Sequence, residues 1–196
     1  ALDDAGTYAF NGTSSNKLGT NPSNAFQIVR WDAASGAGTQ LTTGTSSTSP
    51  LVSVTDDGVW LAFPSPLDLA GQNHDQSTEV FVMRNDGTSI TQLTSDPAPN
   101  AGNVSSVFIA GGGTKVLFVS DCDYLGTNAA HRAQLFVVNR DGSGLRQLTT
   151  TTTGDVGGIM LSDDATRALF VSGENLTGGN ADLGSDVFVI NTDGTG

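Results

Sequence analysis

The chain repeats one pattern four times, and this repetition limits the folds open to it. A phenylalanine at the end of an apolar run recurs at intervals of 53, 55 and 52 residues, at Phe10, Phe63, Phe118 and Phe170. The triplet Gln-Leu-Thr recurs at residues 40–42, 92–94 and 147–149. A long fixed period built from short apolar runs predicts a stack of similar supersecondary units that depend on one another for stability.

The second copy shows the unit most clearly. Residues 52–54 alternate between apolar and polar and end at the turn Asp56-Asp57-Gly58, as a half-buried strand should. Apolar runs without alternation follow at 59–63 and 80–83, which indicates two strands covered on both faces. The alternating run 90–94 predicts an outer strand. Because no helical period is present, we predict four antiparallel strands in each unit.

Two central strands that are apolar on both faces need a neighbouring sheet on each side. Stacking such sheets around an axis gives a β-propeller, whereas a β-sandwich would not require near-identical units. We therefore predict an all-β fold of about four propeller blades, each a four-stranded antiparallel sheet of roughly 52–55 residues. The predicted repeats span approximately 1–47, 48–102, 103–157 and 158–196, of which the first and last are incomplete.

Both ends of the chain fall inside a predicted sheet. Ala1 and Leu2 supply only the end of a first strand, and Gly196 precedes any fourth Gln-Leu-Thr strand. Unpaired strand edges tend to pair with another chain or segment. We therefore expect the chain to be part of a larger ring. A dimeric ring made by two copies is the second expectation, and a closed monomer of four blades is the third.

The order of motifs resembles a known repeat. Between Asp57 and Thr94 the chain carries Asp-Gly, Leu-Ala-Phe-x-Ser, Val-Phe-Val-Met-x-x-Asp-Gly and Gln-Leu-Thr. This order is similar to the WD-like repeat of TolB-like propellers, which occurs in a periplasmic protein and in propellers attached to prolyl-oligopeptidase-type peptidases. The resemblance covers essentially the whole chain and implies a propeller fold. The Gly-His element of WD repeats proper is absent, so we attribute the single pair Trp31-Asp32 to chance.

The charge balance excludes several classes of partner. The chain has 20 acidic and 8 basic residues and a net charge of −12. A surface this acidic repels phosphate backbones and anionic lipids, and no run approaches the ~20 apolar residues of a membrane span. We expect no nucleic-acid partner and no membrane insertion. The chain is rich in Ser, Thr, Asn and Gly, as exported bacterial proteins often are, so we predict a secreted or periplasmic location.

Two loops carry oxygen donors at alternate positions. These are Asn73, Asp75, Ser77 and Glu79 in the second copy, and Asn180, Asp182 and Asp186 in the fourth. Alternate oxygens that end in a carboxylate resemble the first half of a calcium loop. The alternative is that the Asn and Asp side chains form Asx-turns and that the final carboxylates accept backbone amides. Calcium is the only cofactor that the sequence suggests.

Catalytic motifs are sparse. Neither His74 nor His131 has a spaced partner for zinc, and no Gly-x-Ser-x-Gly elbow occurs. The paired acids Asp56-Asp57 and Asp163-Asp164 fall in predicted turns. Cys122 lies between two aspartates, which predicts a raised pKa for its thiol. We therefore predict no enzymatic activity within this chain.

These observations favour a non-enzymatic, exported propeller that serves as a protein-interaction or structural assembly module. We expect a protein partner, or self-association, at the face of the long loops or at the open blade edges. One alternative is the propeller portion of a secreted peptidase or polysaccharide-active enzyme whose catalytic domain lies outside this chain. The other is a carbohydrate-binding propeller, for which Tyr124 is the candidate stacking residue.

Overall fold

The computed structural model describes residues 1–45, 51–96 and 102–196. Within these ranges the chain forms four antiparallel sheets and no helix. The first sheet holds β1 (Tyr8–Thr13), β2 (Gln27–Asp32) and β3 (Gly38–Gln40), and the second holds β4 (Ser53–Val54), β5 (Trp60–Ser65), β6 (Glu79–Arg84) and β7 (Thr91–Gln92). The third holds β8 (Val104–Ile109), β9 (Lys115–Ser120), β10 (Gln134–Asn139) and β11 (Arg146–Gln147), and the fourth holds β12 (Val156–Leu161), β13 (Arg167–Ser172) and β14 (Asp186–Asn191).

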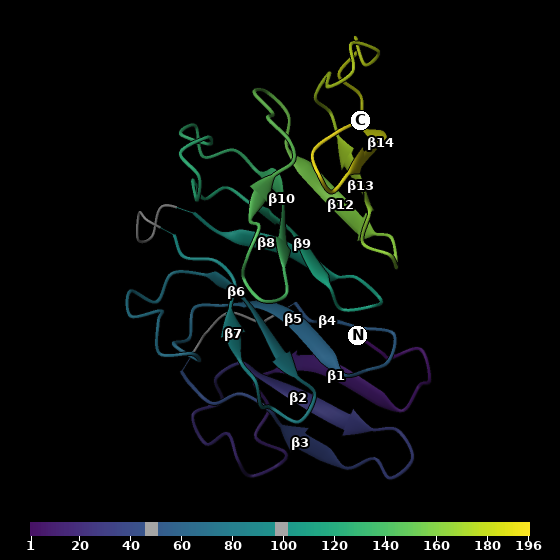
Figure 1. The fold of residues 1–196 in the computed structure, drawn as a ribbon. Helices are drawn as coiled ribbons and strands as arrows, with labels where there is room; N and C mark the ends of the chain where they lie inside the picture. Colours follow the sequence, from purple (N-terminus) through teal and green to yellow (C-terminus); the bar gives the residue numbers. More distant parts are fainter. Residues whose placement is uncertain (46–50, 97–101) are drawn as a thin grey trace.

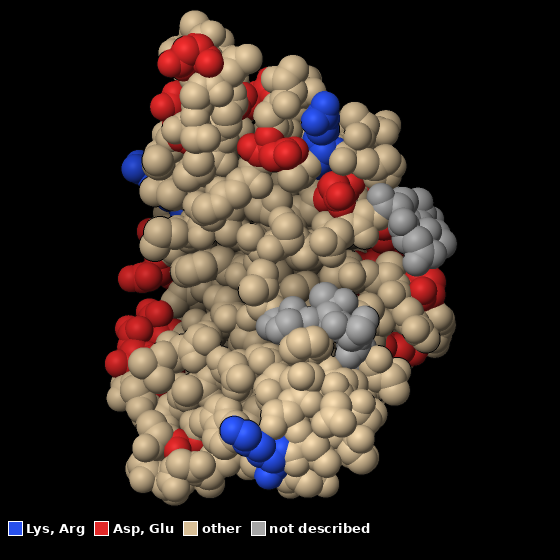
Figure 2. All heavy atoms as spheres, turned by 180° about the vertical axis from the view of Figure 1, so that it is seen from behind, with Lys and Arg blue, Asp and Glu red and all other residues tan. Residues whose placement is uncertain are grey.

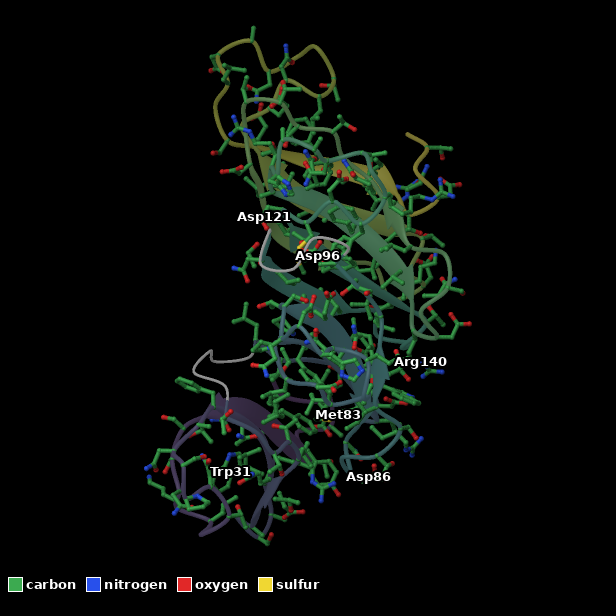
Figure 3. All side chains as sticks on the ribbon, turned by 90° about the vertical axis from the view of Figure 1, so that its left-hand side faces the viewer. Trp31, Met83, Asp86, Asp96, Asp121 and Arg140 are labelled. Carbon is green, nitrogen blue, oxygen red and sulfur yellow. The ribbon has the colours of Figure 1, made fainter. Side chains whose placement is uncertain are left out.

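Each sheet is a meander in which strands that follow one another in sequence pair side by side. The four sheets succeed one another along the molecule, and neighbouring sheets pack face to face (Figure 1). The first and last sheets lie at opposite ends in two different views (Figures 1 and 3). The four sheets therefore form an open array of blades, and the expectation of a closed four-bladed monomer is wrong.

The apolar core consists of three clusters, and each cluster fills the space between two neighbouring sheets. Phe10 and Ile28 of the first sheet meet Leu61, Phe63 and Phe81 of the second. The next two clusters join the second sheet to the third and the third sheet to the fourth in the same way. Every sheet therefore depends on its neighbours for its core, as the repeat pattern predicts.

The central strands of the second and third sheets are covered on both faces, as predicted. In β5, Leu61 and Phe63 face the first sheet and Ala62 faces the third. All three side chains are fully buried. The fourth sheet differs because only one of its faces is covered: Val187 and Val189 on β14 are 64% and 56% exposed.

A pair of phenylalanines lies at the centre of three sheets. Phe63 stacks on Phe81 with ring centroids 6.0 Å apart, and the pairs Phe118–Phe136 and Phe170–Phe188 stack at 5.4 Å. Each pair joins directly opposed residues of two antiparallel strands. These rings belong to the core, as expected from their position in apolar runs.

The strand register of the first copy differs by one residue from the match of Phe10 with Phe63, Phe118 and Phe170 in the sequence. Ser65, two residues after Phe63, lies opposite Glu79, and Thr13 lies opposite Gln27 in the same way. The residue of the first sheet that matches Phe63 is therefore Asn11, and Phe10 matches Ala62. Aligning Phe10 with the other three phenylalanines was wrong, and its side chain points toward the second sheet because it occupies the opposite face of its strand.

Basic side chains reinforce the contacts between sheets. The guanidinium of Arg140, in the third sheet's turn, lies 4.1 Å from the ring centroid of Trp60 in the second. The ammonium of Lys115 donates a hydrogen bond of 2.7 Å to the hydroxyl of Thr192, in the turn after β14. These polar contacts lie at the margins of the apolar clusters and help to fix the orientation of each blade on the next.

Candidate functional site

Each long loop contains an asparagine that organises it. The side-chain amide of Asn73 donates to the carbonyl of Ser77 at 2.8 Å, and the backbone N–H of Asn73 donates to Asp68. The same pair of contacts is made by the matching residue of every other loop, at Asn21, Asn128 and Asn180. The third residue after each asparagine has a positive φ, at Asn24, Gln76, His131 and Leu183. The recurring Asn therefore closes an Asx-turn that sets the shape of the loop.

The Gln-Leu-Thr triplet joins the fourth-strand segment to the start of the third strand. In the second sheet, the hydroxyl of Thr94 accepts the N–H of Val80 and donates to the carboxylate of Glu79. In the third sheet, Thr149 makes the same two contacts to Leu135 and Gln134. This role of the threonine cannot be read from the triplet alone, because its partner is about 15 residues away.

Glu79 is buried and accepts two further hydrogen bonds inside the protein. Its Oε1 atom accepts the N–H of Asp96 at 2.6 Å and the hydroxyl of Ser77 at 2.9 Å. Burial raises the pKa of the Glu79 carboxyl, although the hydrogen bonds from Thr94, Asp96 and Ser77 oppose that shift. In the first and third sheets this position is occupied by a neutral amide, Gln27 or Gln134.

The structure brings the four predicted ligands of the second loop together. The hydroxyl of Ser77 lies 3.3 Å from Oδ1 of Asn73, 3.0 Å from Oδ1 of Asp75 and 2.9 Å from Oε1 of Glu79. A hydroxyl has one hydrogen, so it satisfies one of these three oxygens at a time. The loop thus gathers oxygen atoms as a cation site would, and calcium at this loop stays a prediction.

The fourth loop arranges its predicted ligands differently. Asn180 is buried and bonds within the loop, and Asp182 accepts the N–H of Gly184 at 3.2 Å. Asp186, at the start of β14, is exposed, whereas the matching Glu79 is buried. Across the described ranges, no group of three or more His, Cys, Asp or Glu side chains is placed to hold a metal ion.

A buried polar region lies beside Glu79, between the second and third sheets. Figure 3 shows Asp96 and Asp121 near each other, close to a sulfur atom. Burial raises the pKa of the Cys122 thiol to about 11, with a smaller contribution from Asp96. The predicted direction is confirmed, but its main cause is burial rather than the flanking aspartates. At this pKa the thiol is protonated at neutral pH and is a poor nucleophile.

Tyr124 packs in the interior instead of presenting a stacking surface. Its ring meets Phe136 and Phe118 edge-on, at centroid distances of 5.4 and 6.0 Å, and its hydroxyl lies 3.2 Å from Ser120. The predicted use of Tyr124 as a carbohydrate platform therefore does not fit the structure. The two histidines lie on the loops: Nδ1 of the exposed His74 is 3.1 Å from Asp68, and His131 contacts the carbonyl of Asp121.

Sequence reasoning missed a pocket on the first sheet, at the end of the molecule away from the fourth sheet. Trp31, on the first sheet (Figure 3), lines a cavity of about 210 Å³ together with Asn11, Lys17 and Gln40. The only available signal was the replacement of the phenylalanine pair by Asn11 and Val29. That signal was hidden by the one-residue error in aligning Phe10.

Acidic side chains lie along both sides and across the upper part of the view in Figure 2. Asp56 lies in one of the turns that carry these acids. Its pKa is raised by partial desolvation and by the negative charges of Asp4 and Asp163. Mutual repulsion of this kind indicates a local negative potential.

Comparison with solved structures identifies the fold. The putative TolB from Agrobacterium tumefaciens is similar with a TM-score of 0.67 and 15% identity, over 100% of this chain and 61% of that protein. TolB from Acinetobacter baumannii gives 0.63 and 16% identity, over 98% of this chain and 40% of that protein. A prolyl endopeptidase gives 0.60 and 11% identity, over 99% of this chain and 26% of that protein. The fold is therefore that of TolB-like β-propellers, as the motif order implied.

The chain spans less than two thirds of the length of these structures. No protein-family model and no curated protein matches the sequence. No segment among the described residues forms a helix long and apolar enough to cross a membrane.

Proposed function

We propose that this protein is a non-enzymatic, exported β-propeller module that binds another protein through the uncovered face of its last sheet. The observation that carries this proposal is a match of position between two sheets. Leu117 and Leu135 of the third sheet are fully buried against the fourth. The residues at the same positions of the fourth sheet, Leu169 and Val187, face away from the third, and Val187 is 64% exposed.

The uncovered face is a continuous apolar surface. Met160, Leu169 and Val189 lie opposite one another across β12, β13 and β14, and Val171 pairs with Val187 in the next row. Met160, Val187 and Val189 are each more than half exposed. Apolar surface of this kind on a protein usually marks a binding site.

The occupant that fits this face is a β-sheet that carries a stacked phenylalanine pair. The equivalent face of the third sheet is covered by such a pair, Phe170 and Phe188. The first sheet of a second copy does not fit, because it carries Asn11 and Val29 at the positions of this pair. Leu18 of its long loop also lies against Gly38 of the same sheet. We therefore assign the face to a blade-like sheet that carries such a pair.

The test adds such a sheet to the intact chain. A duplicate of residues 95–157 is joined after Gly196, and position 189 is marked by Val189→Cys. The native Cys122 is buried, so it adds little background to maleimide labelling. We expect Cys at position 189 to label rapidly in the original chain and slowly in the extended chain.

A matched extension separates specific packing from simple proximity. In the control, the added unit carries Phe118→Asn and Phe136→Val, which reproduce the residues of the first sheet. This extension should leave the labelling rate unchanged. Equal protection by both extensions, or protection by neither, would refute the assignment of this face.

A second candidate is the propeller portion of a larger enzyme. The similarity to a prolyl endopeptidase, of which the chain spans 26%, favours this candidate. Peptidase assays on the 196-residue protein and on the product of its natural gene would separate the two. Activity that appears only in a longer natural product would favour the second candidate.

A further inference from the structure

The cavity on the first sheet has a lining unlike that of the spaces between sheets. Its volume is about 210 Å³, and β1, β2, β3 and the loop of residues 14–26 supply its walls. Amide and hydroxyl side chains predominate in the lining, among them Asn11, Thr13, Asn21, Gln27 and Gln40. The spaces between neighbouring sheets are filled by aliphatic and aromatic side chains instead.

The cavity lies on the first sheet at the positions where the other sheets carry the phenylalanine pair. Asn11 lies directly opposite Val29, at the positions that carry Phe63 and Phe81 in the second sheet. Both Asn11 and Val29 line the cavity. Replacing two aromatic rings by an amide and a small aliphatic side chain leaves the space open and makes part of its wall polar.

Trp31 forms a fixed aromatic wall. Its indole N–H donates a hydrogen bond of 2.8 Å to Oδ1 of Asn11. Its ring also lies against Gly38, where an added Cβ would be 2.8 Å from Cζ3 of the indole. The ring is therefore held in place by two neighbours and needs little reordering to receive a ligand.

The polar groups of the wall are also held in fixed orientations. Gln40 accepts the hydroxyl of Thr20 at 2.7 Å and donates to the carbonyl of Thr42 at 2.8 Å. Gln27 donates to the carbonyl of Gly44 at 2.8 Å and accepts the hydroxyl of Thr42. Fixed amides of this kind provide directional hydrogen bonding around an aromatic wall.

Lys17 is the one charged residue among those that line the cavity. The chain has only two lysines and a net charge of −12, so a cation here is set against the charge of the rest of the molecule. An ammonium beside amides and an indole favours an anionic group on an otherwise neutral, hydroxylated ligand.

We propose that this cavity binds one acidic sugar unit, a pyranose that carries a carboxylate. The C–H face of the sugar ring packs on the indole of Trp31, as an apolar group packs on an aromatic ring. The hydroxyls of the sugar bond to the amides of the wall, and its carboxylate pairs with Lys17. The volume suits a single sugar unit rather than a long chain.

Tryptophan fluorescence reports directly on this site. The chain has two tryptophans, and Trp60 packs against Arg140 in a different part of the molecule. The variant Trp60→Phe therefore leaves Trp31 as the sole tryptophan, which can be excited selectively over the two tyrosines. Titration with sodium galacturonate should shift its emission with saturation. Galactose, which lacks the carboxylate, should bind roughly two- to fivefold more weakly, as expected for the loss of one exposed ion pair.

Two variants in the Trp60→Phe background test the assignment. Lys17→Gln should remove the preference for galacturonate over galactose and the sensitivity of galacturonate binding to salt. Asn11→Phe with Val29→Phe restores the pair found in the other sheets and should abolish binding of both sugars. Circular dichroism and thermal melting show whether this double variant folds.

The proposal fails if neither sugar changes the emission of Trp31 at millimolar concentrations. It also fails if the folded double variant binds as well as its parent, because the ligand then lies elsewhere. Equal affinity for the two sugars in the parent would overturn the role of Lys17.

Discussion

The hydroxyl of Thr94 donates a hydrogen bond to the buried carboxylate of Glu79, although a neutral glutamine takes the place of that carboxylate in two other sheets. The contact joins the end of one strand segment to the beginning of another. Its repetition shows that the link is a part of the blade. Among the four described sheets, a buried carboxylate at this position occurs in the second sheet, whereas the matching Asp186 of the fourth sheet is exposed.

We predict that Glu79→Gln raises stability at neutral pH in the presence of EDTA. Burial raises the pKa of the Glu79 carboxyl, so folding favours its protonated form. Its contribution is therefore most favourable below the unfolded pKa and is lost as the pH rises through the folded pKa. An amide avoids this loss. Thermal melting should show a gain of roughly 2–4 °C, or about 1 kcal/mol.

The difference between Glu79→Gln and the parent should shrink as the pH falls below the ordinary pKa of glutamate. Glu79→Ala serves as the control, since it removes the hydrogen bonds as well and should lower the melting temperature. A lower melting temperature for Glu79→Gln at neutral pH would contradict the explanation by charge burial.

Glu174 should give the opposite dependence on pH. The amides of Gly154, Thr153 and Thr152 hold the pKa of this carboxyl at about 2. Its contribution is therefore present above the unfolded pKa and is lost as the pH falls toward about 2. We expect Glu174→Gln to melt below the parent at neutral pH, with a gap that closes in acid. A gap that is constant with pH would show that the amides do not favour the ionised form.

Phe136→Ala should strongly destabilise the protein. The ring is fully buried, stacks on Phe118 and meets Tyr124 edge-on. Removing it leaves a cavity between the second and third sheets, at a cost of about 3–5 kcal/mol. Urea denaturation followed by fluorescence measures this cost. A variant as stable as the parent would contradict the position of this strand in the core.

A matched pair of valines tests the uncovered face. Val137 and Val189 occupy the same position in the third and fourth sheets, but they are 3% and 56% exposed. Val137→Ala should cost about 2 kcal/mol because it removes two buried methyl groups. Val189→Ala should lower the free energy of unfolding by only a few tenths of the cost of Val137→Ala. Comparable losses would mean that the face is covered in solution.

Calcium should raise the melting temperature if the second loop binds it. A site at a calcium concentration of ~100 times its Kd gains about 2.7 kcal/mol. Three oxygens converge on Ser77 only in the second loop, so Asp75→Asn should abolish the response and Asp182→Asn should not. The melting temperatures of the parent and of both variants are compared in EDTA, in calcium and in magnesium. No shift between EDTA and calcium would reject the site.

The fold could be predicted because the same physical demands recur in each copy. Apolar runs without alternation, such as 80–83, can be satisfied only between two layers, and the spacing of the copies fixes the size of each layer. Asx-turns at residues such as Asn73 were also foreseeable from local sequence.

Features that depend on distant partners were not predictable from one sequence. Leu117 and Leu169 occupy the same strand position with the same residue type, so nothing in the local pattern distinguishes a covered face from an open one. The cavity beside Trp31 depends on which residue lies opposite Asn11, and strand register is set by long-range pairing. The burial of Tyr124 likewise depends on rings from two other strands.

Because every apolar cluster joins two sheets that are consecutive in the chain, the array can be built in one direction during synthesis. Each completed blade offers a finished surface on which the next can order as it leaves the ribosome. Folding of these four sheets then needs no contact between the first and the fourth, and an error in one sheet affects only the surfaces that it shares with its neighbours.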